Sequence, residues 1–149
     1  MATDTASSKS TGFSAAERDA MKARAAELRA EGRAGAKKAD GLQAVLDAIE
    51  AMAPEDRALA ERVHLTVTAA APDLAPKTWY GMPAYANAEG KVVLAFKNAG
   101  KFNLRYSTLE FQDSAKLDDG DFWSVGFAIV SWNDAVQQKV AHLVAKAAS

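Results

Sequence analysis

The spacing of apolar residues changes near Pro72, and this change constrains the fold more than any other feature of the 149-residue chain. Before Pro72, apolar residues recur every three or four positions, as on the buried face of a helix. The clearest stripe consists of Leu42, Val45, Leu46, Ile49 and Met52. After Pro72, short β-prone runs are separated by turn residues. The chain therefore predicts helices followed by strands.

Helix-start signals divide the first half into three predicted helices. Ser14 and Glu17 form a capping-box pattern, and the helix that follows is expected to run to Glu31. Asp40 is the expected cap of a second helix, and Pro54 suits the first turn of a third. A fourth helix is expected near the C-terminus, capped by Asn133 or Ser131, with Val136, Val140, Leu143 and Val144 facing inward.

The second half predicts several antiparallel strands joined by short turns. Gly81 and Pro83 predict an irregular turn, while Asn87–Gly90 and Asn98–Gly100 have hairpin chemistry. The predicted strands cover Lys77–Tyr80, Val92–Phe96, Phe102–Tyr106 and Phe122–Val130. This order favours an α+β fold, in which an antiparallel meander packs against three N-terminal helices and one C-terminal helix.

Composition narrows the class of protein. Residues 1–12 are predicted to be a disordered tail, 13–38 a helical extension with a linker, and 39–149 the α+β domain. The chain has no cysteine, which excludes a disulfide framework and a thiolate nucleophile. A formal net charge of −1 gives no attraction to nucleic acid or anionic membrane. We expect a cytoplasmic monomer or homodimer whose partner is a small molecule or a metal, and neither nucleic acid nor membrane.

Standard catalytic motifs are missing from the sequence. There is no phosphate-binding glycine loop and no nucleophile elbow, and the two histidines, His64 and His142, form no metal motif. No acid–base pair or activated nucleophile stands out, so no catalytic residue is named. A binding protein is favoured over an enzyme with an unrecognised site.

An aromatic segment, Thr78–Tyr85, is the most unusual stretch of the chain. It combines three aromatic rings with Met, Gly and Pro, which is typical of a kinked strand that lines a small groove. The alternative is a strand that simply enters the core. Lys97, Lys101, Asn103 and Arg105 lie on or next to neighbouring strands, where they could meet an anionic group or form a solvated hairpin. The predicted ligand-binding residues are Trp79, Tyr80, Met82, Pro83, Tyr85, Lys97 and Asn103.

An acidic segment offers a second, different chemistry. Its carboxylates could hold a hard cation such as iron, although their spacing is not that of a calcium loop. The alternative is a solvated turn. The predicted metal ligands are Glu110, Asp113, Asp118, Asp119 and Asp121.

Three parts of the chain together resemble the YdhG-like family of small bacterial proteins. They are Ala71-Pro72-Asp73, the Trp79–Tyr85 segment with its Tyr-Gly-Met-Pro core, and Val92–Phe96; Gly126–Val130 resembles the family's final strand. The resemblance covers about Leu42 to Ala147, preceded by an N-terminal helical extension. It implies a fold similar in outline to frataxin, and some members of the family are described as intracellular iron chaperones. A frataxin-like iron carrier is therefore the alternative to a small-molecule binding protein. The late position of the acidic segment departs from the frataxin pattern, in which the acidic residues lie on a helix and an adjoining strand.

Overall fold

A computed structural model describes residues 14–32 and 38–149, and the predicted tail and most of the predicted linker lie outside the described residues. The helices among them are α2 (Ala15–Glu31), α3 (Lys38–Glu50), α4 (Pro54–Ala70), α5 (Ala99–Phe102) and α6 (Asp134–Ala148). The strands are β1 (Ala75–Trp79), β2 (Met82–Ala86), β3 (Val92–Lys97), β4 (Ser107–Phe111) and β5 (Gly126–Ile129). None of these helices has the length and apolarity that crossing a bilayer requires.

The sheet is an antiparallel meander, so the predicted α+β class is confirmed. Its spatial order is β1-β2-β3-β4-β5, and each strand pairs with its neighbour in sequence. Short connections favour this arrangement, because an antiparallel partner needs only a tight turn while a parallel one needs a long crossover. Two edges remain, at β1 and β5.

Local capping signals located three helices well. Ser14 accepts the backbone N–H of Glu17 and makes the predicted capping box. Pro54 opens α4, and the Asn133 side chain accepts the backbone N–H of Val136 at the start of α6. Helix α3 differs, since it begins at Lys38 and Asp40 lies inside its first turn.

The prediction for Phe102–Tyr106 was wrong. The alternating residues there are not a strand, because the chain forms the short helix α5, which ends at Asn103 in the left-handed conformation. Strand β4 starts only at Ser107. The predicted final strand is also shorter, since residues 122–125 precede β5 as an exposed loop.

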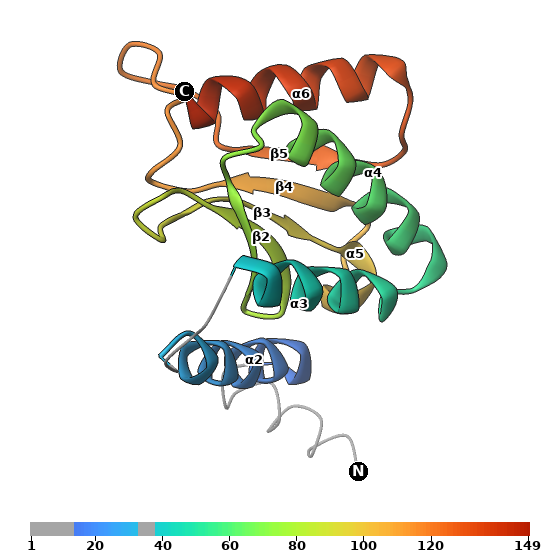
Figure 1. The fold of residues 1–149 in the computed structure, drawn as a ribbon. Coiled ribbons are helices and arrows are strands. Elements are labelled where there is room, and N and C mark those ends of the chain that lie inside the picture. The colour runs from blue at the N-terminus through green and yellow to red at the C-terminus, as the bar shows by residue number, and fades with distance from the viewer. Residues whose placement is uncertain (1–13, 33–37) are drawn as a thin grey trace.

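Helices α3, α4 and α6 cover the same face of the sheet (Figure 1). Val45 of α3, Val63 of α4 and Val144 of α6 are almost completely buried there. Tyr85 and Phe96 fill this core from the sheet side. Burying each such side chain contributes about 1.5–3 kcal/mol to folding. Leu42 and Leu46 of the predicted stripe are exposed, so only part of that stripe faces the core.

Helix α2 lies apart from the other long helices, beside β1 and α5 (Figure 1). A second, smaller cluster forms around Met82, Ala84 and Ala95, with Trp79 and Phe102 packed against it. The two sides of β2 therefore face two separate apolar clusters. Side chains of the aromatic segment that lie on opposite sides of β2 therefore cannot line the same groove.

Candidate functional site

The aromatic segment does not line one groove. Gly81 and Pro83 were predicted to form an irregular turn, but Trp79 pairs directly with Met82 and β2 runs through Pro83. Because side chains alternate along a strand, Met82 and Tyr85 point to opposite faces. Tyr85 is 1% exposed in the large core, whereas Met82 is 6% exposed in the small cluster.

The other predicted ligand-binding residues are equally scattered. Pro83 is completely buried, and Trp79 packs against the small cluster. Tyr80 is 37% exposed, at the turn between β1 and β2. The ammonium group of Lys97 lies 4.8 Å from the centre of the Phe102 ring, and Asn103 caps α5. None of the predicted seven lines either of the two hollows described below.

The acidic segment does not gather its carboxylates. Glu110 lies on β4, where its carboxylate accepts a hydrogen bond from the Thr108 hydroxyl at 3.1 Å. Asp113, Asp118, Asp119 and Asp121 are exposed. Within residues 14–32 and 38–149, no group of three or more His, Asp or Glu side chains lies close enough together to hold a metal ion. Strand β4 and the loop after it keep these side chains apart.

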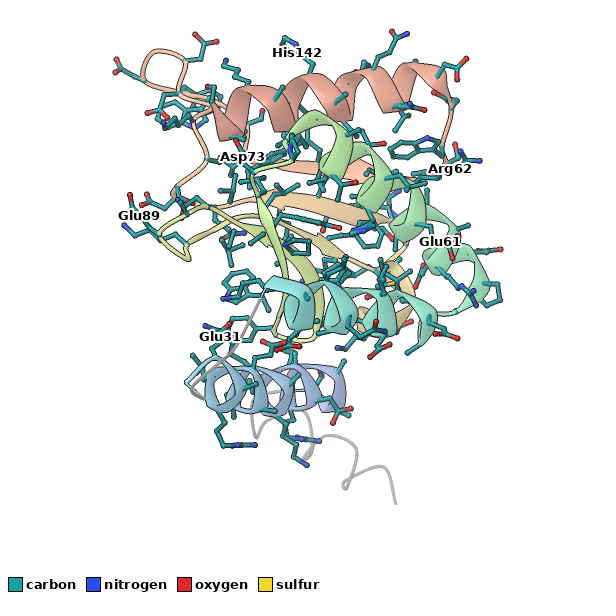
Figure 2. All side chains as sticks on the ribbon, in the orientation of Figure 1. Glu31, Glu61, Arg62, Asp73, Glu89 and His142 are labelled. Atoms are coloured by element: carbon teal, nitrogen blue, oxygen red, sulfur yellow. The ribbon has the colours of Figure 1, made fainter. Side chains whose placement is uncertain are left out.

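A hollow of about 490 Å³, here called the arginine groove, lies beside α4 and the start of α5. Its other walls are the segment just before β4 and the segment that follows β5. Figure 2 shows Arg62 on α4, next to the segment that joins β5 to α6. The charged, polar and aromatic side chains in its lining are those of Glu55, Asp56, Arg62, Arg105, Tyr106, Ser107, Ser131 and Trp132. Apolar lining comes from Leu59 and Ile129.

Asp56 ties the wall of this groove together. It lies in the first turn of α4 and is only 8% exposed. Its Oδ2 accepts hydrogen bonds from the Asn98 side-chain amide at 3.2 Å and from the Gly100 backbone N–H at 2.8 Å. A Cβ on residue 100 would lie 2.6 Å from the same oxygen, so this approach requires glycine. The contact fixes α5 against the start of α4.

A hydroxyl completes this connection. The Ser107 Oγ accepts the backbone N–H of Ala99 at 3.0 Å, which joins the first residue of β4 to the first residue of α5. Ser107 is buried, and both residues line the groove. The groove is therefore framed by a hydrogen-bonded network and does not depend on loop packing alone.

Two guanidinium groups give the groove its chemistry. Arg62 and Arg105 are exposed, and the Arg105 guanidinium lies 4.9 Å from the centre of the Tyr106 ring. The sequence drew attention to Arg105 as a cation near a binding region and to Asp56 as an acid at the start of a helix, but it offered no reason to single out Arg62 or Trp132. Their spacing along the chain carries no signal, because only the folded sheet brings α4 beside the segment after β5.

A second hollow of about 460 Å³ contains His64. The Nδ1 of His64 lies 2.8 Å from the hydroxyl oxygen of Tyr85, which ties α4 to β2. Burial lowers the pKa of His64 from its usual value of 6.5, and burial raises the pKa of the Tyr85 hydroxyl.

The lowered pKa of His64 links stability to pH. Below about pH 6.5 the unfolded chain binds more protons at this residue than the folded chain does. The contribution of neutral His64 to stability is therefore fully present above that pH and is lost as the pH falls through the lowered pKa.

No family model, curated protein sequence or solved structure matches this chain. The resemblance to the YdhG-like family thus rests on the residues that carry it, above all Trp79–Tyr85, and the functional argument rests on the geometry of the chain itself.

Proposed function

We propose that this chain is an intracellular, non-enzymatic binding protein whose arginine groove holds a small anionic molecule with a flat apolar part. One observation carries the proposal: Arg62 of α4 and Arg105 of the segment between α5 and β4 line the same hollow together with the rings of Tyr106 and Trp132. The YdhG-like resemblance is compatible with this function and does not specify a ligand.

The side chains match this class of ligand. A guanidinium group donates two parallel hydrogen bonds to a carboxylate or phosphate, which gives both affinity and orientation. Aromatic rings add contact area for a planar group, and Tyr106, Ser107 and Ser131 bring hydroxyl groups to the lining. A volume of about 490 Å³ lies within the range of small-molecule sites.

The groove favours binding over catalysis because its most buried acid is already engaged. Asp56 receives hydrogen bonds from Asn98 and Gly100, and these bonds hold the wall in place. The groups left for a ligand are two guanidinium groups, hydroxyls, rings and the exposed carboxylate of Glu55 at the edge of α4, and together they recognise charge and shape.

Benzoate is the first probe for this proposal, because it combines a carboxylate with a flat ring. We expect saturable chemical-shift changes at the Trp132 indole N–H and at the Nε–H of Arg62 and Arg105. Replacing either arginine by glutamine should weaken binding about 10-fold, the effect of losing one charged contact worth about 1.4 kcal/mol.

Arg57→Gln is the matched control, since Arg57 lies on the same helix but lines the other hollow. Equal weakening by Arg57→Gln, or shifts that avoid Trp132 and both groove arginines, would contradict the proposal. Anaerobic titration with ferrous iron tests the alternative function. Saturable broadening confined to the region from Glu110 to Asp121 would replace this proposal with a frataxin-like iron carrier.

A further inference from the structure

The turn between β1 and β2 has an unusual backbone. Tyr80 and Gly81 both have positive φ angles, of 53° and 78°. They form a two-residue hairpin turn, since Trp79 pairs with Met82. Glycine adopts this conformation freely, but it is rare for a bulky side chain such as tyrosine. Two successive backbone N–H groups in such a turn form a concave site that favours an anion.

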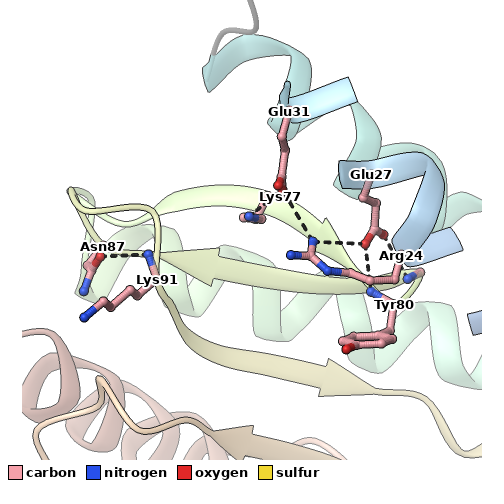
Figure 3. Close-up of polar contacts among 8 residues, drawn as sticks. Arg24, Glu27, Glu31, Lys77, Tyr80, Asn87 and Lys91 are labelled. Atoms are coloured by element: carbon pink, nitrogen blue, oxygen red, sulfur yellow. Dashed lines mark hydrogen bonds and ion pairs between the residues drawn. The ribbon is translucent and has the colours of Figure 1, made fainter. Parts of the chain in front are cut away.

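A carboxylate already fills this site. The Glu27 side chain of α2 reaches the turn and accepts one hydrogen bond with each of its oxygens (Figure 3). Tyr80 N–H donates to Oε1 at 2.8 Å, and Gly81 N–H donates to Oε2 at 3.0 Å. The Glu27 side chain is only 10% exposed, so these bonds are shielded from water.

Two cationic side chains, Lys101 and Arg24, lie beside the turn. The Nζ of Lys101 lies close to Gly81: a Cβ atom added to residue 81 would be 2.6 Å from this nitrogen. Arg24 lies between Glu27 and Glu31, at 3.6 Å from an oxygen of each, and its guanidinium carbon is 5.8 Å from the centre of the Tyr80 ring. The Nη1 of Arg24 is buried, and among the described residues it has no acceptor within hydrogen-bond distance. The Arg24 guanidinium is therefore ion-paired with the occupant of the turn but leaves a buried N–H available for a closer oxyanion.

We propose that the Tyr80–Gly81 turn is a binding site for an oxyanion, a carboxylate or a phosphate, and that Glu27 is its built-in ligand. The site is separate from the arginine groove, because no residue of α2, β1 or β2 lines that groove. The bidentate contact with Glu27 defines the ligand chemistry: one oxygen on each N–H, beside Lys101.

Glu27 is held in place by a weakly buried helix. Ala20 is the only residue of α2 that is fully buried, and the apolar side chains of Met21 and Leu28 are exposed. Polar contacts therefore hold much of α2 against the sheet. Dissolved ions can replace such contacts more readily than they can disrupt a packed core. An external oxyanion competes with Glu27 for the two N–H groups. Its apparent affinity is its affinity for the open site multiplied by the fraction of chains in which Glu27 has left the site.

Glu27→Ala in the full chain opens the site for a direct test. Sodium acetate and inorganic phosphate are titrated separately, and the amide signals of Tyr80 and Gly81 are followed by NMR. We expect saturable shifts at both amides in the variant, with binding at least about 10-fold tighter than in the unchanged protein. The stronger of the two anions identifies whether the site prefers a carboxylate or a phosphate.

Glu31→Ala is the matched control. Glu31 lies one turn further along α2 and pairs with Lys77 and Arg24, but it does not contact the turn. This variant should respond to anions as weakly as the unchanged protein does. If α2 detaches in Glu27→Ala, the turn remains accessible and the expected shifts are unchanged.

Two results would overturn the proposal. The first is equal anion response in all three proteins, or no response in Glu27→Ala. The second is loss of the positive φ at Tyr80 in Glu27→Ala, measured by backbone scalar couplings, because the turn would then be a product of Glu27 and not a preformed site.

Discussion

Replacing Asp56 by alanine is expected to destabilise the protein by about 3–5 kcal/mol. The change removes the oxygen that accepts hydrogen bonds from Asn98 and Gly100. It leaves the buried Asn98 amide without this acceptor, whereas Gly100 is itself exposed. A hydrogen bond to a charged group contributes about 1.5–3 kcal/mol. The lost carboxylate also stabilises the N-terminus of α4 by about 0.3–1 kcal/mol. The hydrogen-bond and helix-terminus contributions are not independent, because one side chain makes them all. The expected loss of stability is therefore close to the sum of two hydrogen bonds of moderate strength.

Two companion variants separate the hydrogen bonds from the charge. Glu55 occupies the same first turn of α4 but is exposed, so Glu55→Ala should lose only the helix-terminus contribution, about 0.3–1 kcal/mol. Asp56→Asn keeps one acceptor oxygen and the shape of the side chain. We expect its loss of stability to lie between those of the two alanine variants.

Urea unfolding, followed by tryptophan fluorescence and circular dichroism, measures all three variants. With a slope of about 1–3 kcal/mol per molar urea, the midpoint of Asp56→Ala should fall by about 2 M with little change in slope. A loss within about 1 kcal/mol of the Glu55→Ala value would refute the reasoning. It would mean that the Asp56 contacts are no stronger than those of an exposed helix-terminal acid.

Two further predictions concern α3 and α4. Gly41→Ala should destabilise the protein by about 1–3 kcal/mol and lower its melting temperature, because the new Cβ would overlap the carbonyl oxygen of Pro76. At an exposed helical position the same change would stabilise the protein by about 1 kcal/mol. A rise in melting temperature would therefore contradict the close packing of α3 on β1. His64→Gln should flatten the fall in unfolding free energy as the pH drops below about 6.5, because it removes the group whose pKa burial lowers. An unchanged slope in His64→Gln would assign the pH dependence to other groups. His142→Gln is the matched control, since His142 is exposed and points away from the sheet (Figure 2).

Features that depend on neighbouring residues were predictable from the sequence. The Ser14 capping box, the proline that opens α4 and the Asn133 cap each act within one helical turn, so their effect is visible in a few consecutive residues. The change of apolar period after Pro72, together with short turns, was enough to predict an antiparallel meander after three helices.

Errors arose where contacts distant in the sequence decide the local structure. The alternation in Phe102–Tyr106 has the period of a strand, but the buried carboxylate of Asp56 accepts the Gly100 N–H and stabilises the short helix α5. Tyr80 is not a residue that predicts a left-handed turn, and the carboxylate of Glu27, 53 residues away from it, receives the two N–H groups there. In both places a side chain from another element outweighs local preference.

The sequence by itself determined the α+β class, the placing of three helices before the antiparallel strands and one after them, and the starts of several helices, because local hydrogen bonding and apolar period control these. Only the tertiary structure decided that Met82 and Tyr85 face opposite clusters, that the carboxylates after Glu110 stay apart, and that Arg62 and Arg105 line one groove. The physical reason is that a site is made of side chains from several elements. Their meeting depends on strand register and on helix packing across the sheet, which no local pattern specifies.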